Sequence, residues 1–308
     1  MAPQIREISA ELQATAKERL NEDPDRIEAD LEALKTWIAQ QPHLNPRTDD
    51  QFLVGFLRGC KYSLEKTKSK LDKYYTLRTK YPELFSVTDV DDPKLREIHR
   101  MGPIVYLPNT LDGARIGMFR IGITPTDKYN IVDVMRVGQV MQEIGLLEDD
   151  NAIINGVVLI MDMKSATAAH MFQMTPGLAK KMTVFNEEAF PMRPKAQHFV
   201  NTIPGFETVF NMIKPMMSKK QQERLFVHGK MESLTEHVPL KYLPKEYGGE
   251  NGSIEEIVAE MDKKFDQYRD YFKANAQFGT DEKLRPGNPI DFDSLYGTEG
   301  SFRKLNVD

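Results

Sequence analysis

The sequence predicts an α/β protein in which a helical N-terminal domain precedes a domain with a mostly parallel sheet. Two patterns carry this prediction. Up to about residue 95, apolar residues recur at helical spacing. After Pro108, short apolar strands alternate with amphipathic helices, a pattern that favours parallel strands joined by right-handed crossovers. We expect the domains to span residues 1–95 and 96–275, followed by an extended C-terminal tail at 276–308.

The N-terminal helices are predicted from apolar spacing and from signals at the helix ends. One helix ends before Pro42. The capping-box pattern from Thr48 to Gln51 opens a second helix. A third is expected from about Ser63 to Lys80, with Pro82 beyond its end. The apolar positions of the first two helices are Ile27, Leu31, Leu34, Ile38, Phe52, Leu53, Phe56 and Leu57.

The second domain is predicted to contain four strands, at residues 115–121, 156–161, 197–201 and 225–227. The wholly apolar residues 157–160 fit a sheet that is covered on at least one face. Two helices between the strands each carry one apolar face. These faces comprise Val134, Val137, Met141 and Ile144 in the first helix, and Leu178, Met182, Phe185 and Ala189 in the second.

Composition narrows the functional class. The 308 residues carry a formal net charge of −5, which argues against a general nucleic-acid binder. The single cysteine, Cys60, excludes an internal disulfide and fits a reducing compartment. No secretory signal is present, and the longest apolar run, at 157–161, is far shorter than the ~20 residues that span a bilayer. We therefore expect a cytoplasmic protein whose membrane contact is transient and peripheral.

The motifs of common catalytic sites are missing from the sequence. No strand is followed by a glycine-rich phosphate-binding loop, and there is no G-x-S-x-G elbow. The six histidines have no metal-ligand spacing, so His170 and His198 are interpreted as hydrogen-bonded structural residues. Asp162 lacks a second acid two residues later and is interpreted as a capping or ion-paired residue. We expect a protein that is not an enzyme and that has no catalytic residues, metal or cofactor.

An apolar helix lies beside a group of cations in the sequence. Its stripe of Phe206, Val209, Phe210 and Ile213 has helical spacing and is interrupted by Pro215. A second capping box starts at Ser218, and the turn that follows aligns Lys220 with Arg224. Between Arg193 and Arg224 there are six basic and two acidic residues, a local balance of about +4. The pattern suits an apolar helix that meets an anionic membrane with basic residues around it. Two alternatives remain open: the apolar stripe packs in the core, and the basic residues form an ordinary solvated surface.

Several motifs in order resemble the CRAL-TRIO lipid-binding family, and within it the alpha-tocopherol transfer proteins. The segment from Phe52 to Tyr62 resembles the N-terminal FLRARKF-type signature, with Cys60 at the position of its second arginine. The ending 300–305 is similar to that of arthropod members. The resemblance covers roughly residues 25–275, and its further motifs lie at 156–162, 170–176, 190–191, 212–215 and 243–249.

This resemblance implies a sheet-floored lipid cavity closed by a mobile gate helix at about residues 205–217. Asn186 falls where the family has an apolar residue, so it is either a polar anchor or faces away. The implied gate residues are Phe206, Val209, Phe210, Ile213 and Met217. The implied residues of the lipid pocket are Val157, Met161, Met174, Met182, Phe185, Asn186 and Met192.

The resemblance also implies contact with anionic membranes through phosphoinositide head groups. Arg58 is assigned either to this contact or to a structural ion pair. The implied basic residues are Arg58, Arg193, Lys195, Lys220 and Arg224.

The expected function is the binding and intermembrane transfer of a small hydrophobic lipid by a monomer. The cargo is an isoprenoid-type lipid such as tocopherol, a retinoid or carotenoid, or a terpenoid hormone, and the 16 methionines suit such an adaptable pocket. Two alternatives remain, namely exchange of phosphatidylinositol and phosphatidylcholine, and presentation of a ligand to a signalling partner. An isomerase acting on a retinoid has the least support.

Overall fold

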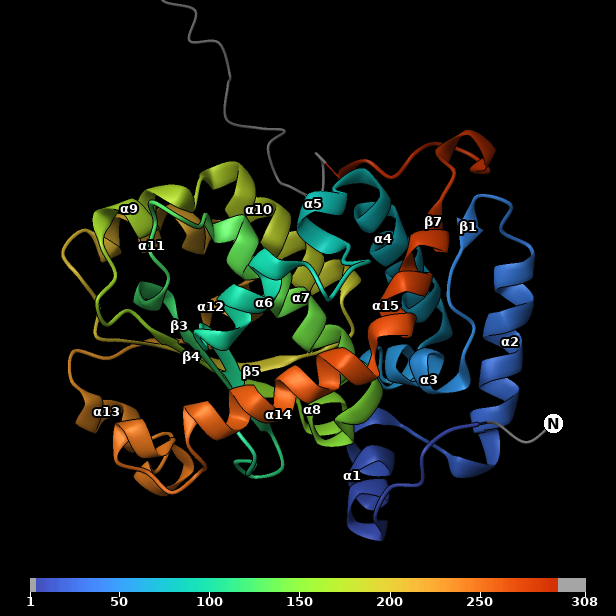
Figure 1. The fold of residues 1–308 in the computed structure, drawn as a ribbon. Coiled ribbons are helices and arrows are strands. Elements are labelled where there is room, and N and C mark those ends of the chain that lie inside the picture. Colours follow the sequence, from blue (N-terminus) through green and yellow to red (C-terminus); the bar gives the residue numbers. More distant parts are fainter. Residues whose placement is uncertain (1–3, 293–308) are drawn as a thin grey trace, which may run out of the picture.

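The computed structural model describes residues 4–292 and confirms the predicted α/β class. The predicted domain limits stay a prediction. The helices of the N-terminal part are α1 (Ala10–Leu20), α2 (Ile27–Ala39), α3 (Asp50–Gly59), α4 (Leu64–Lys80), α5 (Pro82–Phe85) and α6 (Pro93–Arg100). Helices α1 to α4 group together at one side of the molecule, and the sheet lies at the other (Figure 1).

The main sheet has five strands in the order β2-β3-β4-β5-β6. Neighbouring strands from β3 to β6 are parallel, whereas β2 pairs antiparallel with β3. The strands are β2 (Ile104–Tyr106), β3 (Arg115–Arg120), β4 (Val157–Asp162), β5 (Pro194–Val200) and β6 (Leu225–Val227).

Helices connect the parallel strands, as parallel pairing requires. Between β3 and β4 lie α7 (Ile131–Glu148) and α8 (Asp150–Asn155). Between β4 and β5 lie α9 (Ala168–Gln173), α10 (Pro176–Val184) and a π-helical turn, η3 (Phe185–Ala189). Between β5 and β6 lie α11 (Phe206–Ile213), η4 (Lys214–Met216) and α12 (Lys219–Gln222). The chain continues through α13 (Met231–Thr235), α14 (Ile254–Gln267) and α15 (Arg269–Ala274).

The structure confirms the four predicted strands, with small shifts at their ends, and the three predicted N-terminal helices. The capping box at Thr48 is wrong. Helix α3 begins after Asp49 without a side-chain cap, and the Gln51 side chain instead accepts a hydrogen bond from the backbone of Arg6. The cap at Ser218 is confirmed, since its hydroxyl accepts a hydrogen bond from the Gln221 backbone. Strand β2 was not among the predicted strands.

The two faces of the sheet differ in how fully they are buried. One face, which we call the packed face, buries Ile116, Met118, Val158, Ile160 and Val200 in a core shared with α14. The other face carries apolar side chains that are only half-buried, and we call it the gate face. Its members along the register are Phe119, Leu159, Met161 and Phe199.

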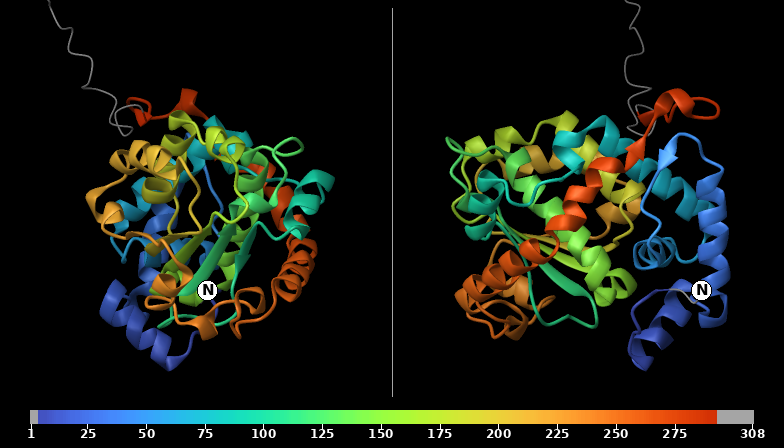
Figure 2. Two further views of the ribbon diagram at one scale, coloured as in Figure 1. Left: turned by 90° about the vertical axis from the view of Figure 1, so that its left-hand side faces the viewer. Right: turned by 45° about the vertical axis from the view of Figure 1, so that its right-hand side comes forward.

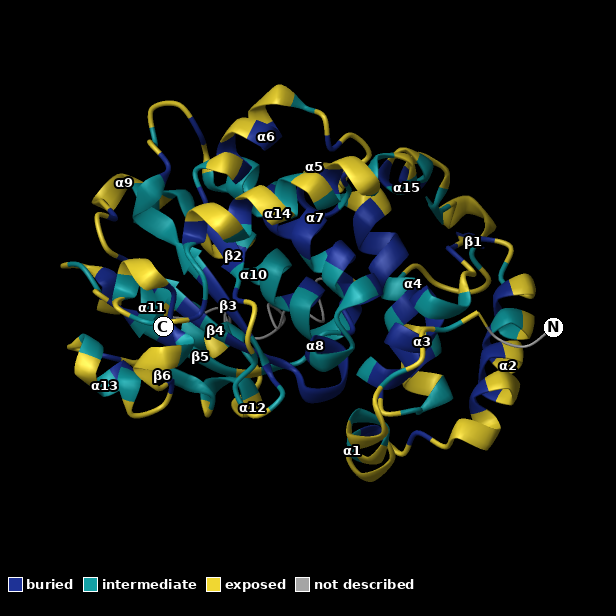
Figure 3. Ribbon diagram, turned by 60° about the horizontal axis from the view of Figure 1, so that its bottom comes forward, coloured by how far each residue is buried: buried dark blue, intermediate teal, exposed yellow. Residues whose placement is uncertain are grey.

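Helices on opposite sides of the sheet account for this difference. In Figure 1, α9, α10 and α11 lie above the sheet, and α13 and α14 lie below it. Figure 2 shows the same separation from two other directions. Ile254 and Val258 of α14 and Leu234 of α13 seal the packed face. Figure 3 shows the exposed outer sides of α2 and α13 around a buried interior.

The helical part and the sheet part share one continuous core. The ring of Phe185 stacks on that of Phe85 at 4.2 Å, and Tyr74 contacts Phe185 from α4. The buried Arg78 of α4 forms an ion pair with Glu143 of α7 at 2.9 Å. Because these contacts join the helical part to α7 and η3, the N-terminal helices fix the position of the elements that border the gate face.

The C-terminal tail follows the N-terminal helices for as far as it is described. Strand β7 (Gly279–Thr280) pairs antiparallel with β1 (Leu44–Asn45). Phe292 is 2% exposed and belongs to the core of the helical part. The rest of the predicted tail, with the motif at 300–305, lies outside the described residues.

Two buried histidines link β5 to the end of β6. Nδ1 of His198 lies 2.8 Å from Nε2 of His228, so one ring nitrogen donates a proton and the other accepts it. The pKa of His198 is lowered from 6.5 to about 4, chiefly by burial and to a lesser extent by the neighbouring His228 and His237 rings. The folded protein therefore holds this pair neutral at neutral pH.

Replacing His198 with Gln should make the free energy of unfolding less dependent on pH. In the wild type, His198 binds a proton more readily when the chain is unfolded than when it is folded. The stability that the neutral, buried His198 provides is therefore complete above pH 6.5 and is lost as the pH falls toward 4. We expect the wild type to lose on the order of 2 kcal/mol over this window through this group. Urea unfolding at a series of pH values measures the loss. An unchanged pH profile in His198→Gln would contradict the assignment.

Candidate lipid-binding site

The gate face of the sheet offers a row of apolar side chains that the protein covers incompletely. Met161 lies in the middle of this row, directly opposite Phe119 on β3 and Phe199 on β5. All three side chains are half-buried, whereas their neighbours on the packed face are almost fully buried. An apolar surface with fewer protein neighbours than the opposite core gains by contact with an apolar ligand.

Helix α11 covers part of the gate face with the predicted stripe. The ring of Phe206 lies 5.2 Å from that of Phe199, and the ring of Phe210 lies 5.4 Å from it. Phe206 is buried and Phe210 is half-buried, as are the other predicted gate residues, Val209, Ile213 and Met217. The helix starts at Gly205, whose φ of 86° suits a residue without a side chain. The stripe therefore faces the sheet.

The predicted pocket residues fall into two groups. Val157 and Met161 both point to the gate side of β4, but only Met161 is half-buried, whereas Val157 is 2% exposed. Met182, Phe185 and Asn186 come from α10 and η3, and Phe185 is fully buried in the core that η3 shares with the N-terminal helices. Met182, Met192, Met174 and Asn186 are half-buried, and Met192 lies against Gly145 of α7.

Three further residues share this surface and were not predicted from the sequence, namely Leu159, Phe119 and Phe199. Leu159 lies between Val157 and Met161, and the period of two in a strand was sufficient to find it. Phe119 and Phe199 lie opposite Met161, which depends on the strand register and so on the three-dimensional pairing.

Two large apolar side chains close to the gate are exposed to solvent. Phe172 of α9 is 80% exposed and Met212 of α11 is 37% exposed. Met171, which precedes Phe172, packs in the same small cluster as Phe206 and Phe210. Exposed aromatic side chains next to an apolar cluster are typical of surfaces that meet a membrane or a partner.

The five predicted basic residues divide into an exposed and an inward group. Lys195 and Lys220 are exposed, and Arg224 is half-buried with Nη1 donating to the carbonyl of Pro194. Arg193 points inward, and its guanidinium donates to the backbone carbonyls of Arg58 and of α8 at 2.8–2.9 Å. Arg193 thus ties β5 to α3 and α8.

Of the two roles considered for Arg58, contact with a head group and a structural ion pair, the structure shows the ion pair. It is 2% exposed and bonds Glu22 at 2.7 Å and Asp150 at 2.9 Å. Burial disfavours the charge of Glu22, but hydrogen bonds from Arg58 and the charge of Arg58 outweigh burial and lower the pKa of Glu22. Tyr62 donates a further hydrogen bond to Glu22 at 3.0 Å. This network joins α3 to α8.

Asp162 and His170, which were considered as functional residues, form structural hydrogen bonds. Asp162 accepts hydrogen bonds from the backbone of Lys164 at 2.9 Å and from Asn201 at 2.7 Å, and Tyr247 also donates to it. Asp162 was predicted to be either a capping or an ion-paired residue, and these bonds show that it caps the end of β4. His170 is hydrogen-bonded to Thr167 and to the carbonyl of Thr124. Within residues 4–292 no group of His, Cys, Asp or Glu residues could hold a metal ion.

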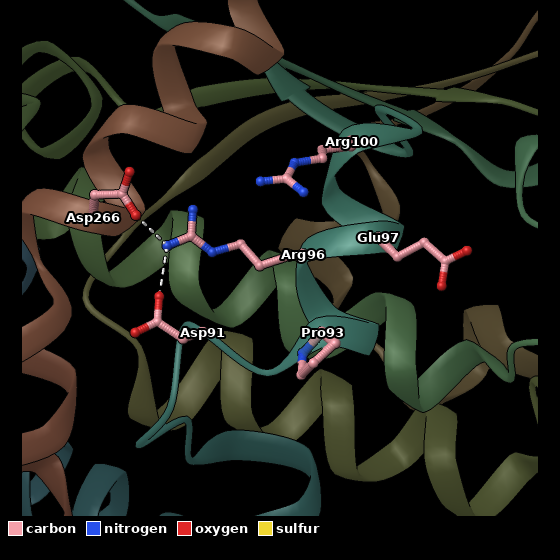
Figure 4. Close-up of a pocket in the computed structure, with 6 residues that line it drawn as sticks. All are labelled: Asp91, Pro93, Arg96, Glu97, Arg100 and Asp266. Atoms are coloured by element: carbon pink, nitrogen blue, oxygen red, sulfur yellow. Dashed lines mark hydrogen bonds and ion pairs between the residues drawn. The ribbon is translucent and has the colours of Figure 1, made fainter.

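Two hollows of about 470 and 460 Å³ lie beside α6 and α14, away from the gate face. In the first, Arg96 reaches toward Asp91 and Asp266, with ion pairs of 3.1 and 2.7 Å (Figure 4). These charged side chains line the hollow and join α6 to α14. A charged lining suits the packing of two helices and is unsuited to an apolar ligand.

Comparisons with known proteins agree with this architecture. A family model described as CRAL/TRIO domain matches residues 99–249, and one described as Pinta-like, UBA domain matches residues 23–95. Proteins called alpha-tocopherol transfer protein-like from Mus musculus and Homo sapiens are 30% identical over 251 residues, covering 80% of this chain and 72% of each relative. Clavesin-2 from Rattus norvegicus is 28% identical over 246 residues, covering 79% and 75%.

The fold and the site define a class of protein in which a helical domain precedes a mixed sheet with one incompletely covered apolar face. The chain belongs to the CRAL/TRIO family. Among solved structures, one described as the crystal structure of Sfh5 matches with a TM-score of 0.49 at 15% identity over 82% of this chain and 92% of that chain. In the described part of the chain, no helix has both the length and the apolar character that crossing a bilayer requires.

Replacing Arg58 with Met should destabilise the protein strongly, because it leaves Glu22 buried and unpaired. We expect a loss of about 3–5 kcal/mol in the free energy of unfolding. The control is Lys263→Met, which removes an exposed ion pair with Glu260 and should cost less than about 1 kcal/mol. Urea unfolding measures both. If the Arg58 variant is no less stable than the control, Arg58 is not the structural ion-pair partner described above.

Proposed function

We propose that this protein binds a small hydrophobic lipid of the isoprenoid type and transfers it between membranes. Tocopherol, a retinoid or carotenoid, and a terpenoid hormone all fit this chemistry. The observation that carries the proposal is the gate face, a row of half-buried apolar side chains partly covered by α11. Membership of the CRAL/TRIO family and the similarity to proteins named alpha-tocopherol transfer protein-like support it.

The energetics of burial explain why such a carrier needs a gate. A ligand that buries on the order of 500 Å² gains up to about 12 kcal/mol, at roughly 25 cal/mol per Å². Release into water is therefore slow, and delivery requires the site to open at an acceptor membrane. Helix α11 suits this role because its apolar stripe covers the gate face and Met212 on its outer side is exposed.

Anionic, phosphoinositide-containing membranes are the proposed place where the gate opens. Lys195 and Lys220 are exposed and Arg224 is half-buried, and Phe172 and Met212 supply apolar side chains that can enter the interface. Each basic residue contributes about 1 kcal/mol at an anionic surface, and salt reduces this attraction. Three such residues favour transient contact rather than permanent anchoring. In this mechanism the membrane competes for the apolar surface of α11 and frees the cargo.

Replacing Met161 with Trp should weaken cargo binding at least about tenfold, because the larger ring occupies the middle of the gate face. Retinol fluorescence and radiolabelled α-tocopherol provide two probes of affinity. The matched control is Val227→Trp, on the same side of the sheet at its exposed edge, where Val227 is 48% exposed. Overpacking costs typically about 1–3 kcal/mol, so thermal unfolding checks that the variant is folded. A folded Met161→Trp variant with wild-type affinity for both probes would contradict this binding surface.

Reversing the charges of Lys220 and Arg224 to Glu should weaken binding to phosphoinositide vesicles about tenfold or more at low salt and leave cargo affinity unchanged. Vesicle flotation and cargo titration measure the two quantities. A double charge reversal of Lys241 and Lys263 makes the same change in net charge beside the packed face and serves as control. Equal vesicle binding by the two double variants would rule out docking through this surface.

A further inference from the structure

Two polar side chains at the border of the gate face have no hydrogen-bond partner in the described part of the chain. Oε1 of Gln142 on α7 is buried and accepts no hydrogen bond from residues 4–292. The hydroxyl group of Tyr106 on β2 forms no hydrogen bond within the same range, although its side chain is half-buried. Buried polar groups in proteins nearly always form a hydrogen bond, so two such groups at one border indicate a molecule from outside the chain that bonds them.

The strand register places Tyr106 on the gate face. Tyr106 pairs with Gly117 on β3, and Gly117 pairs with Leu159 on β4. A Cβ atom on Gly117 would lie 2.9 Å from Cε1 of Tyr106 and 3.1 Å from Cδ2 of Leu159. Because Gly117 has no side chain, the ring of Tyr106 lies across it. The tyrosine side chain therefore extends from the edge strand toward the middle of the gate face.

The packing of α7 on β2 brings Gln142 to the same place. A Cβ atom on Gly138 of α7 would lie 3.0 Å from Cδ1 of Ile104. Helix α7 returns the chain between two parallel strands, so it runs opposite to them and in the direction of β2. The four residues from Gly138 to Gln142 keep one helix face and advance about 6 Å. The two residues from Ile104 to Tyr106 advance about 6.6 Å, so Gln142 lies beside Tyr106.

The charged groups near Tyr106 disfavour an ionised ligand. The pKa of Tyr106 is raised, first by burial and then by the negative charge of Asp149 at the end of α7. Arg115 is already committed to Asp149 and to the backbone carbonyls of Leu107 and Pro108. A carboxylate or phosphate on the ligand would therefore meet a negative charge, and Arg115 is not free to pair with it.

A hydroxyl group is the neutral ligand chemistry that satisfies both side chains. The phenol of Tyr106 can donate a hydrogen bond, and Oε1 of Gln142 can accept one. The oxygen of a ligand hydroxyl accepts from Tyr106 while its proton is donated to Gln142. An ether or carbonyl oxygen only accepts, and a hydrocarbon does neither.

We propose that Tyr106 and Gln142 together bind the hydroxyl group of the cargo, so that the protein selects a lipid alcohol or phenol over the matching ether, aldehyde or hydrocarbon. This inference rests on the proposed function and names the head group of its cargo. The apolar part of the lipid then lies along Phe119, Met161 and Phe199. A site built to bond a hydroxyl discriminates strongly, because an analogue without it leaves the buried polar groups unpaired.

The test compares retinol with retinyl methyl ether, and α-tocopherol with its methyl ether, on the full chain. Each ether keeps the isoprenoid part and the oxygen but lacks the proton. Fluorescence titration and competition measure the affinities. We expect the wild type to bind each alcohol about tenfold more tightly than its ether.

Two variants separate the two hydrogen bonds. Gln142→Met should weaken the alcohols about fivefold and change the ethers less than about twofold, because an ether has no proton to donate to Gln142. Tyr106→Phe should weaken alcohols and ethers alike by about fivefold, because both oxygens accept from the phenol. Gln142→Leu repeats the first comparison if the Met variant misfolds, and thermal unfolding checks each variant.

The matched control is Tyr242→Phe on the other side of the sheet. Tyr242 is half-buried against the core of the packed face, and its hydroxyl forms no hydrogen bond among residues 4–292. The same deletion of a hydroxyl there should leave every affinity within about twofold of the wild type.

Three outcomes would overturn the inference. One is equal wild-type affinity for alcohols and ethers, which means that water, not cargo, bonds the two side chains. A second is equal weakening of alcohols and ethers in Gln142→Met, which assigns the loss to packing. A third is retinal binding as tightly as retinol. All three leave the carrier function intact, whereas uptake of none of these lipids by the wild type contradicts the proposed function itself.

Discussion

The unequal covering of the sheet is the constraint on which the site depends. Residues of β3, β4 and β5 alternate between two faces, so the same strands that build the core shared with α14 must also present Phe119, Leu159, Met161 and Phe199 on the other side. On that side α11 supplies Phe206 and Phe210 but leaves the row half-buried. A surface of this kind favours contact with an apolar ligand.

The N-terminal helices support this arrangement from one side. Phe85 stacks on Phe185, Arg78 pairs with Glu143, and Arg58 pairs with Glu22 and Asp150. A buried ion pair adds little net stability over an apolar pair, but breaking one is costly, so such pairs fix geometry. They hold α7, α8 and η3 in place, and α11 does not take part in them. Helix α11, which covers the gate face, is thus not held by the buried ion pairs that hold α7 and α8.

Much of this structure could be predicted from the sequence. Period two in the strands and helical spacing in α2, α4, α7 and α11 are local signals, and they located these elements to within a few residues. Strand β2 was missed because three residues carry too little periodicity. The capping box at Thr48 failed because the helix begins one residue later than predicted, after Asp49 and without a side-chain cap, and because the Gln51 side chain bonds the backbone of Arg6 instead.

The candidate site was less predictable, because it depends on contacts between distant segments. The proximity of Met161 to Phe119 and Phe199 follows from strand register, and the position of Arg193 follows from its hydrogen bonds to α3 and α8. Sequence alone also could not decide between a surface and an ion-paired role for Arg58, since the choice depends on the burial of Glu22. The apolar stripe of α11, in contrast, was predicted in full because it lies within one helix.

The most direct test of this account is to identify the lipid that the protein carries. Native mass spectrometry of the protein purified from its natural source, followed by denaturation and extraction, gives both the identity and the stoichiometry of the ligand. The account predicts one isoprenoid-type lipid bound at close to one molecule per chain. A mixture of phosphatidylinositol and phosphatidylcholine, or no lipid at all, would contradict it.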